Sequence, residues 1–489
     1  MSLLETRSSG VLLHVTSLPG PFGSGDLGAE AFRFIDLLAT AGVRTWQVLP
    51  LNPPGPGFSP YFALSSFAGN PSLISPASLA PGAGPYAVGG DAQKADFEAA
   101  HRLRDHALRA AFATLDSAAN AELDEFSVRH NWWLDDWTLF ATLERRYGSP
   151  WQTWPREFAS RARAALARAR MEFAPEIRYH QFVQQCFEQQ WHAVRSYATD
   201  AGLSILGDLP IFPALHSSDV WAHQHVFKLG PSGYPDVVGG VPPDYFSETG
   251  QRWGTPLYRW DVEAGGGYAY WRARLRRMFE LYDTLRIDHF RGFAAAWEIP
   301  AAEPTAIRGQ WVTGPGKSFF DAVAKEVPLG SIVAEDLGLI TPDVIELRDS
   351  LAFPGMLVLQ FAFDSGATNL YLPHNHVPGA VVYTGTHDND TTRGWWDQQP
   401  DVVRDNVAEY VGYAPADPVA ALVRAAFMSV ARLAIVPMQD LLGLGSEARM
   451  NLPGTAEGNW AWRFRWDQVS EGLADELRSL LVRYGRATA

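Results

Sequence analysis

Residues 284–292 read Thr284-Leu-Arg-Ile-Asp-His-Phe-Arg-Gly292, a short and mainly apolar run that ends in charged side chains. Such a run, bounded by polar residues, is typical of a buried β-strand. A carboxylate directly after a buried strand, here Asp288, is costly unless it is paired or used in chemistry. The stretch therefore predicts a sheet whose functional residues gather where the strands end.

The same pattern recurs along the chain and gives eight candidate strands. The other seven are Val11–Val15, Val43–Leu49, Leu203–Leu206, Ile332–Ala334, Met356–Phe363, Val381–Thr386 and Ala434–Met438. Amphipathic helices are expected between them, such as Glu30–Ala41, Tyr270–Leu281 and Thr341–Ser350. Alternating strands and helices predict an α/β protein with a parallel sheet. Eight such units favour a (β/α)₈ TIM barrel with its active site at the C-terminal strand ends. A doubly wound open sheet is the main alternative, although Thr16–Gly28 lacks the G-x-G-x-x-G turn typical of that fold.

We expect a single catalytic domain over residues 10–489, interrupted by two insertions on the catalytic face. Residues 52–200 are expected to form a mainly helical subdomain. Its helical segments are Asp91–Leu115, Asn131–Tyr147, Pro155–Met171 and Tyr179–Ala198. Residues 213–267 are rich in Gly, Pro, His and aromatic side chains and are expected to form a loop-rich subdomain.

Charge and cysteine content exclude several classes of function. The net charge of −14 argues against a nucleic-acid partner and against an anionic membrane, because each needs clustered Lys and Arg. The chain has no run of about 18 apolar residues that would predict a membrane-spanning helix. Cys186 is the only cysteine, so a disulfide framework is not expected and a cytoplasmic location fits best. No cofactor and no metal are predicted.

Two further acidic residues follow predicted strands as Asp288 does. Glu335 stands in Ala334-Glu-Asp-Leu-Gly338 and Asp388 in Thr386-His-Asp-Asn-Asp390. The fourth and fifth strands, which carry Asp288 and Glu335, would be neighbours in a barrel. Adjacent strand ends can bring two carboxyl groups to about 5–5.5 Å, the separation of a retaining glycosidase pair. For each residue alone, a structural role as a strand-end cap or salt bridge is the alternative. Three more acidic residues are interpreted as structural, namely Asp283, Asp336 and Asp390.

The chemistry distinguishes the roles of the three. A nucleophile must stay ionised, and Arg286 lies two residues before Asp288, on the same face of the strand, where its charge is expected to hold the carboxylate. An acid must keep its proton until it donates it, so burial beside a negative charge would suit Glu335. Asp388 is predicted to grip ring hydroxyls and to stabilise a positively charged sugar in the transition state.

Eleven segments between Leu13 and Trp460 are similar, in order, to those of a known enzyme family. They are Leu13–Pro21, Trp46–Leu51, Ser59–Tyr61, Phe67–Pro71, Leu206–Phe212, Gly240–Gln251, Trp253–Gly254, Arg286–Gly292, Val333–Gly338, Tyr383–Asn389 and Met450–Trp460. The chain resembles the 4-α-glucanotransferases of the amylomaltase (disproportionating enzyme) family, a branch of the α-amylase superfamily. Thr255, where Asn is expected, and Leu452, where Thr or Ala is more usual, depart from the pattern and bear on acceptor preference.

The resemblance implies a retaining double displacement with Asp288 as nucleophile, Glu335 as acid/base and Asp388 as the third member of the catalytic trio. A segment of α-1,4-glucan would pass from a donor maltooligosaccharide or starch chain to the 4-hydroxyl of an acceptor glucan or glucose. The substrate-binding residues that it implies are Ser59, Tyr61, Asp208, Gln251, Trp253, Arg286, His387 and Asn459. Trp253 belongs to the loop Pro243–Pro256 over the acceptor side, and large cyclic products would wrap over the loop Asn451–Trp460.

Three other functions remain open at this point. A hydrolytic α-glucosidase could use the same carboxylates, and a non-catalytic glucan-binding protein could share the fold. A metal-dependent barrel hydrolase could use His223-x-His225 or His374-x-His376, because a spacing of two places both ligands on one strand face. The expected partners are glucans and maltooligosaccharides, and the protein is expected to be a monomer or a small homo-oligomer.

Overall fold

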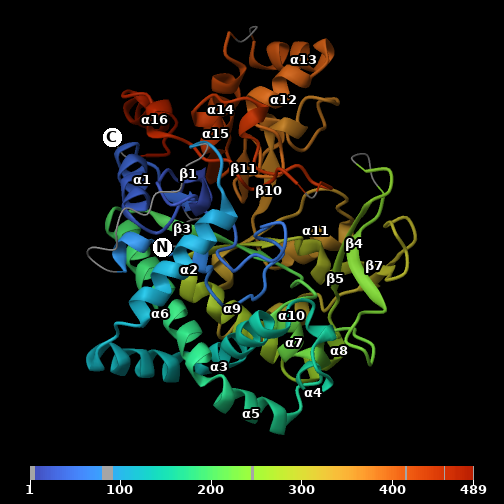
Figure 1. Ribbon diagram of the computed structural model, residues 1–489. Coiled ribbons are helices and arrows are strands. Elements are labelled where there is room, and N and C mark those ends of the chain that lie inside the picture. The colour runs from blue at the N-terminus through green and yellow to red at the C-terminus, as the bar shows by residue number, and fades with distance from the viewer. Residues whose placement is uncertain (1–5, 80–91, 244–246, 413–415, 456, 488–489) are drawn as a thin grey trace.

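Figure 1 shows the chain as a computed structural model, which describes residues 6–79, 92–243, 247–412, 416–455 and 457–487. Eight strands form one sheet in the order β10-β11-β12-β1-β2-β3-β6-β9, and all of its paired strands are parallel. The strands are β1 (Ser8–Leu12), β2 (Thr45–Gln47), β3 (Ser204–Pro210), β6 (Thr284–Asp288), β9 (Ile332–Ala334), β10 (Gly355–Val358), β11 (Ala380–Tyr383) and β12 (Leu433–Pro437). At the seam between the outer two, the N–H of Ala334 donates to the carbonyl of Pro354 at 2.9 Å. The fold is a (β/α)₈ barrel, as the sequence predicted.

The strands form where the sequence is continuously apolar, because helices and the barrel interior bury both faces of a parallel sheet. All five residues of β12, for example, are buried. Five predicted strands extend too far at their C-terminal ends, and after β1 and β10 the extra residues belong to 3₁₀ turns. Val15–Ser17 and Leu359–Phe361 form 3₁₀ turns instead. These turns are also largely buried, so hydrophobicity alone could not mark where the strand stops.

The predicted helices between strands are present with ends that differ by one residue: α1 (Ala29–Thr40), α9 (Ala269–Leu281) and α11 (Pro342–Ser350). Further helices follow later strands. They are α10 (Lys317–Val323), α12 (Thr392–Gln398), α13 (Asp401–Val411), α14 (Pro418–Met428), α15 (Met438–Leu441) and α16 (Leu473–Arg483). None of the helices in the described ranges is long and apolar enough to cross a bilayer.

Residues 92–200 are mainly helical. The helices are α2 (Phe97–Phe112), α3 (Ser117–Tyr147), α4 (Arg156–Ala159), α5 (Arg163–Glu172) and α6 (Ala174–Asp200). The predicted segment Asn131–Tyr147 is only the second half of α3, and Asp91, the first residue of another predicted segment, lies outside the described residues. Helix α6 packs on the barrel: the Trp191 indole donates to the carbonyl of Leu281 at 2.9 Å. Part of the expected insertion is therefore a barrel helix that leads into β3.

Residues 213–267 are not simply loop. They contain α7 (Ser218–Ala222), β4 (Val237–Val241), β5 (Gln251–Pro256) and α8 (Trp260–Gly265). Strands β4 and β5 join β7 (Ala295–Pro300) and β8 (Gln310–Thr313) in an antiparallel sheet of order β5-β4-β7-β8, beside the barrel in Figure 1. These strands were not predicted from the sequence, because β4 contains two glycines, which are unusual in strands. Its partner β7 also lies beyond the next barrel strand, so no local hairpin pattern marks the pair.

Candidate active site

The ends of β3 and β6 bring a buried arginine between two carboxylates. Residues Asp208 and Arg286 are register partners on these strands. The Arg286 guanidinium donates from Nη1 to Asp208 Oδ2 at 2.5 Å and from Nη2 to Asp288 Oδ1 at 2.9 Å. Asp208 is fully buried, whereas 29% of the Asp288 side chain is exposed. The prediction that Arg286 and Asp288 share one strand face is confirmed, and the Arg286 charge is shared with a second acid.

Glu335 is fixed by the backbone at the end of β6. Its own N–H donates to the carbonyl of Ile287 at 3.0 Å, and its carbonyl accepts from the N–H of Phe290 at 3.1 Å. Its side chain accepts from the N–H of His289 at 2.7 Å and from that of Leu337 at 2.9 Å. The side chain that follows β9 is thus bonded to the residue next to Asp288, so the two predicted catalytic carboxylates lie at neighbouring strand ends.

The electrostatics of this pair differ in one respect from the sequence-based expectation. Burial raises the pKa of Asp288 well above its usual range, and the negative charges of Asp208, Glu335 and Asp388 add to the rise, against the opposing charge of Arg286. Burial also raises the pKa of Glu335, against Arg286 and the two backbone N–H groups. Arg286 alone therefore does not lower the pKa of Asp288, because one cation is opposed by burial and by several acids. Interacting carboxyl groups titrate as a unit, and this pair retains a proton to higher pH than isolated carboxyl groups do.

Aromatic rings from three distant segments form one wall of the site. The Tyr61 hydroxyl donates to Asp208 Oδ2 at 2.7 Å, and its ring stacks on His387 with centroids 5.0 Å apart and planes 13° apart. Trp460 is tilted against both rings, at 5.7 Å from Tyr61 and 5.9 Å from His387. Ser59, also predicted to bind substrate, accepts the Tyr61 N–H on its hydroxyl at 3.3 Å and so supports the turn that presents this ring.

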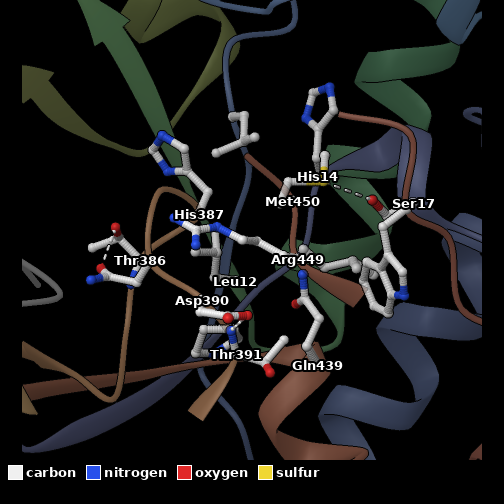
Figure 2. A pocket seen from close by; sticks show the side chains of 15 residues that line it. Leu12, His14, Ser17, Thr386, His387, Asp390, Thr391, Gln439, Arg449 and Met450 are labelled. Atoms are coloured by element: carbon white, nitrogen blue, oxygen red, sulfur yellow. Dashed lines mark hydrogen bonds between the residues drawn. The ribbon is translucent and has the colours of Figure 1, made fainter. Parts of the chain in front are cut away.

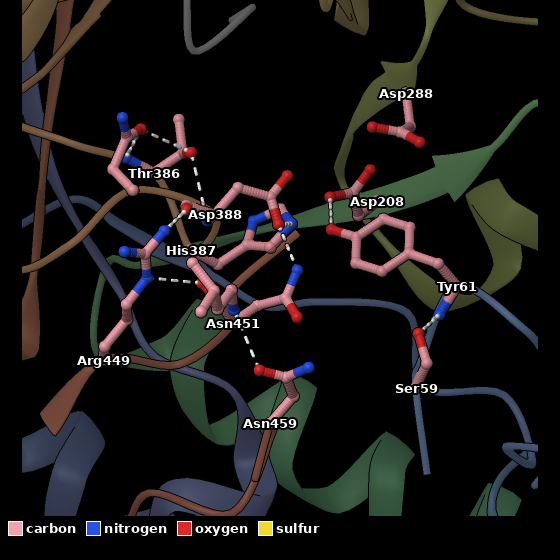
Figure 3. Close-up of polar contacts among 12 residues, drawn as sticks. Ser59, Tyr61, Asp208, Asp288, Thr386, His387, Asp388, Arg449, Asn451 and Asn459 are labelled. Carbon is pink, nitrogen blue, oxygen red and sulfur yellow. Dashed lines mark hydrogen bonds and ion pairs between the residues drawn. The ribbon is translucent and has the colours of Figure 1, made fainter. Parts of the chain in front are cut away.

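Asp388 lies across from Tyr61 and Asp208 in Figure 3 and is held by two residues that the sequence reasoning did not single out. Asn451 donates from Nδ2 to Asp388 Oδ1 at 2.6 Å. Arg449 donates from Nη2 to the Asp388 carbonyl at 2.7 Å and from Nε to the Asn451 carbonyl at 2.8 Å. Asn451 is the first residue of the loop Asn451–Trp460, which is similar in sequence to the family. This similarity is the only feature of the sequence that pointed to Asn451 as a functional residue.

The other predicted substrate-binding residues occupy the loops. Trp253, on β5, meets the ring of His289 edge to face at 4.7 Å, and its indole donates to Gln251 Oε1 at 3.2 Å. The amide of Asn459 binds its own loop: Oδ1 accepts the N–H of Leu452 at 2.9 Å, and Nδ2 donates to the carbonyl of Thr455 at 3.0 Å. Residues 244–246 and 456 of the two predicted covering loops lie outside the described residues.

A small cavity of about 20 Å³ is lined in part by His387 (Figure 2). The side chain of His14 lines it, and burial, together with the nearby His387, lowers the pKa of His14 to about 3. Burial also lowers the pKa of His387. Both imidazoles are therefore neutral near pH 7, and His387 meets the site as a hydrogen-bonding ring rather than as a cation.

The three acids interpreted as structural have structural partners. Asp283 accepts from Arg195 at 2.6 Å and from the N–H of Ile205 at 2.8 Å. Asp336 binds Arg348 and accepts the N–H of Met356 at 2.7 Å, while Asp390 accepts from Ser446 and Gln398.

The His-x-His pairs do not form a metal centre in the described part of the chain, where no group of three or more His, Cys, Asp or Glu side chains is placed to hold a metal ion. His374 bonds the Tyr410 hydroxyl at 3.0 Å and the Ala367 carbonyl at 2.9 Å. His376 bonds the Ser429 hydroxyl at 2.6 Å and the Tyr371 carbonyl at 2.8 Å. His223 and His225 line a separate cavity.

Comparison with known proteins identifies the family of the chain. Residues 13–469 match the family model described as 4-alpha-glucanotransferase. The 4-alpha-glucanotransferase of Thermus thermophilus is 47% identical, over 97% of this chain and 98% of that protein. The chloroplastic/amyloplastic enzyme of Arabidopsis thaliana is 45% identical, over 98% of this chain and 86% of that protein. The amylomaltase from Streptococcus agalactiae, solved in complex with acarbose, superposes with a TM-score of 0.95 at 33% identity, over 99% of this chain and 100% of that one. The chain belongs to the 4-alpha-glucanotransferase family.

Proposed function

We propose that Asp288, Glu335 and Asp388 carry out the glucan transfer of this family by a retaining double displacement. The observation that supports it best is the hydrogen bond from the N–H of His289, the residue after Asp288, to the carboxylate of Glu335. It ties the nucleophile-bearing strand end to the acid. Most enzymes that cleave a glycosidic bond with retention of configuration use two carboxyl groups that flank the bond.

In the first step, Asp288 attacks the anomeric carbon of the donor glucan. The bond from that carbon to the glycosidic oxygen breaks, and Glu335 gives its proton to the departing oxygen. Asp288 makes a direct ion pair with Arg286, and among the described residues Glu335 makes none, so we assign the shared proton to Glu335. The products are a covalent glucosyl-enzyme and a shortened glucan.

In the second step, the 4-hydroxyl of an acceptor glucan attacks the same carbon from the face that the first glucan left. Its proton passes to Glu335, and the Asp288 carboxylate is released. Two inversions restore the α-configuration. The donor is a maltooligosaccharide or a starch chain. The acceptor is another such glucan or glucose.

Asp388 is assigned to the sugar that reacts. It is 47% exposed, and Asn451 holds one of its oxygens, so the carboxylate is fixed yet reachable. A fixed negative charge beside a sugar ring stabilises the positive charge that develops in the transition state. Tyr61, Arg286, Asp208 and His387 are assigned to the same subsite. In that subsite, the ring of Tyr61 offers a flat face and His387 offers a neutral hydrogen-bonding group.

Transfer requires that a sugar hydroxyl, and not water, meet the covalent intermediate. Trp253 and Gln251 on β5, with the loop 451–460, are assigned to cover the acceptor side and to exclude water there. Asn459 contributes by shaping its loop, because its amide is engaged with Leu452 and Thr455. The same loop is the surface over which cyclic glucans would form.

Incubation of the purified protein with maltotriose, followed by chromatography of the products, tests this function. A ladder of longer and shorter maltooligosaccharides from the earliest times is expected. Free glucose as the dominant early product, with no longer oligomers, would instead identify a hydrolytic α-glucosidase. Binding of maltotriose without any turnover would identify a non-catalytic protein.

We also place the enzyme in the cytoplasm as a monomer or small homo-oligomer. The support for the compartment is that its single cysteine, Cys186, is buried and that the chain needs no disulfide. Cell fractionation with an antibody and size-exclusion chromatography with light scattering test the two statements separately.

A further inference from the structure

We propose that the protein has a second saccharide-binding site, in a cavity between α3, α7, α8 and α9 that is separate from the catalytic carboxylates. The cavity has a volume of about 450 Å³. Ligand pockets range over roughly 300–1,000 Å³, so a short oligosaccharide is of the right size. None of the residues assigned to the reaction lines it.

Aromatic side chains form much of the cavity wall. Phe67, Trp132, Trp133 and Tyr270 all line it, and Trp133 and Tyr270 are almost fully buried. Phe67 meets Trp132 edge to face at 5.8 Å, which holds the two rings at right angles. Large, rigid rings bind the C–H face of a sugar at a low entropic cost, because few rotatable bonds must be frozen. Trp132, which is only partly buried, is the ring of this wall that is open to such a contact.

The charges around the cavity argue against an ionic ligand. The guanidinium of Arg276 lies 4.8 Å from the ring centre of Trp132, and that of Arg277 lies 4.9 Å from Trp133, so each ring already has a cation against it. These guanidinium groups lie outside the lining, but each already occupies one face of its ring and weakens the attraction of that ring for a second cation. An anionic ligand would meet the carboxylates of the lining, which includes no Lys or Arg. A neutral ligand is favoured.

The acids of the lining are largely engaged by protein groups. Asp136 is paired with Arg161 at 2.6 Å. Asp219 accepts the N–H of Ser66 and the hydroxyl of Tyr270, each at 2.8 Å. Their charge is therefore not available to select a cation, which again favours a neutral, hydroxyl-bearing molecule.

Two imidazoles provide the polar contacts that such a molecule needs. His223 and His225 both line the cavity, with ring centres 6.4 Å apart, and in the described part of the chain neither ring has a hydrogen-bonding partner. Burial lowers the pKa of His223, so its ring is neutral near pH 7 and offers one donor and one acceptor. Sugar hydroxyls can both donate and accept, and they match such a pair. In this proposal His223 and His225 bind sugar hydroxyls and not a metal ion.

We choose a maltooligosaccharide as the ligand, and this choice rests on the function proposed above. A long glucan held at a second point has a raised local concentration at the reaction centre. The cavity is linked to the aromatic wall of that centre through one loop, because Asp219 binds the N–H of Ser66 and Tyr61 precedes Ser66 on the same loop.

Isothermal titration of the Asp288→Asn variant with maltotriose tests the proposal, because this background binds substrate without turning it over. Gly266 lies at the exposed rim of the cavity, where an added Cβ would meet its nearest neighbours, the carbonyls of Val262 and Glu263, at 3.4 and 3.6 Å. Gly266→Phe therefore blocks the cavity without rebuilding the backbone. Gly265→Phe is the matched control: it is exposed, outside the lining, and its Cβ meets nothing within 4 Å.

We expect the Gly266→Phe derivative to bind one maltotriose molecule fewer than the Asp288→Asn background, with at least a tenfold loss of affinity at the blocked site, and the Gly265→Phe derivative to bind as many as that background. Equal numbers of bound maltotriose molecules in the Asp288→Asn background and in its Gly266→Phe derivative would overturn the proposal. Displacement of the second maltotriose by tetramethylammonium would overturn the choice of a neutral ligand. Failure of the proposed function is a separate result, seen as wild-type protein that makes no product ladder from maltotriose.

Discussion

The backbone N–H of His289 donates a hydrogen bond of 2.7 Å to Oε2 of Glu335. His289 has a φ of +52°, in the left-handed region that non-glycine residues seldom adopt. Strained backbone of this kind is found at functional sites, where the surroundings hold it in place. Because His289 follows Asp288 directly, one short piece of backbone sets the position of both carboxylates.

Replacement of each carboxylate should affect a different step. Glu335→Gln should slow maltotriose transfer by about 10²–10⁴-fold, since proton donation is lost. It should still form the covalent intermediate from α-glucosyl fluoride, whose leaving group needs no proton. Asp288→Asn should lose both reactions. Product chromatography and fluoride release measure them, with the exposed Glu346→Gln as control. Near-normal maltotriose transfer by either variant would refute the mechanism.

The pH dependence should reflect the raised pKa values of the pair. Asp288 acts ionised, and its pKa is raised, so activity should fall on acidification at a higher pH than an ordinary carboxyl group would give. Glu335 acts protonated, and its pKa is also raised, so activity should persist further towards alkaline pH. Asp208→Asn removes one negative charge that raises the pKa of Asp288, and the acid limb of kcat/KM should move to lower pH. An unmoved limb, or one that moves as much in the exposed Asp349→Asn control, would contradict this account.

Asn451 should matter through Asp388. Its 2.6 Å hydrogen bond is made to a charged group, and such bonds contribute about 1.5–3 kcal/mol, so Asn451→Ala should lower kcat/KM by about 10–100-fold. Asn459→Ala should cost less, because its amide binds only its own loop. Steady-state kinetics on maltotriose separate the two. Equal losses in both variants would indicate that the loop as a whole, and not the contact with Asp388, is what counts.

Trp253 should control the choice between transfer and hydrolysis. Trp253→Ala opens the side of the site next to His289 and should raise the ratio of glucose release to oligosaccharide formation, while Trp253→Phe should keep a low ratio. Trp311→Ala, on β8 of the same antiparallel sheet, is the control for damage to that sheet. An unchanged ratio in Trp253→Ala would remove this residue from the proposed water barrier.

Gly207, beside Asp208 on β3, should be required for stability. An added Cβ would lie 2.2 Å from the ring of Tyr282, so the ring must shift. Overpacking of this kind costs about 1–3 kcal/mol. Gly207→Ala should therefore lower the melting temperature, measured by circular dichroism at a fixed scan rate. Gly366→Ala, whose Cβ meets nothing within 4 Å, should leave it unchanged. Equal melting temperatures would show that the strand relaxes around the methyl group.

Much of the barrel could be predicted because its strands are short, continuous apolar runs that end in chemically active side chains. The antiparallel sheet could not, since β4 is glycine-rich and pairs with β7, which lies beyond the next barrel strand. Arg449 and Asn451 were missed for a similar reason: their partner is Asp388, remote in the chain, and no local pattern marks the contact.

The amino-acid sequence by itself determined the barrel and placed Asp288 and Glu335 at strand ends, because the patterns that mark strands and helices are local in the sequence. It placed Asp388 too close to its strand, since β11 already ends at Tyr383. Only the tertiary structure decided that Arg286 divides its charge between Asp208 and Asp288, and that Asn451 holds Asp388. It also decided that four helices line a common cavity. These contacts and this cavity depend on how segments that are distant in the sequence pack together. A pKa likewise depends on all groups that are near in space, and most of these are far away in the chain.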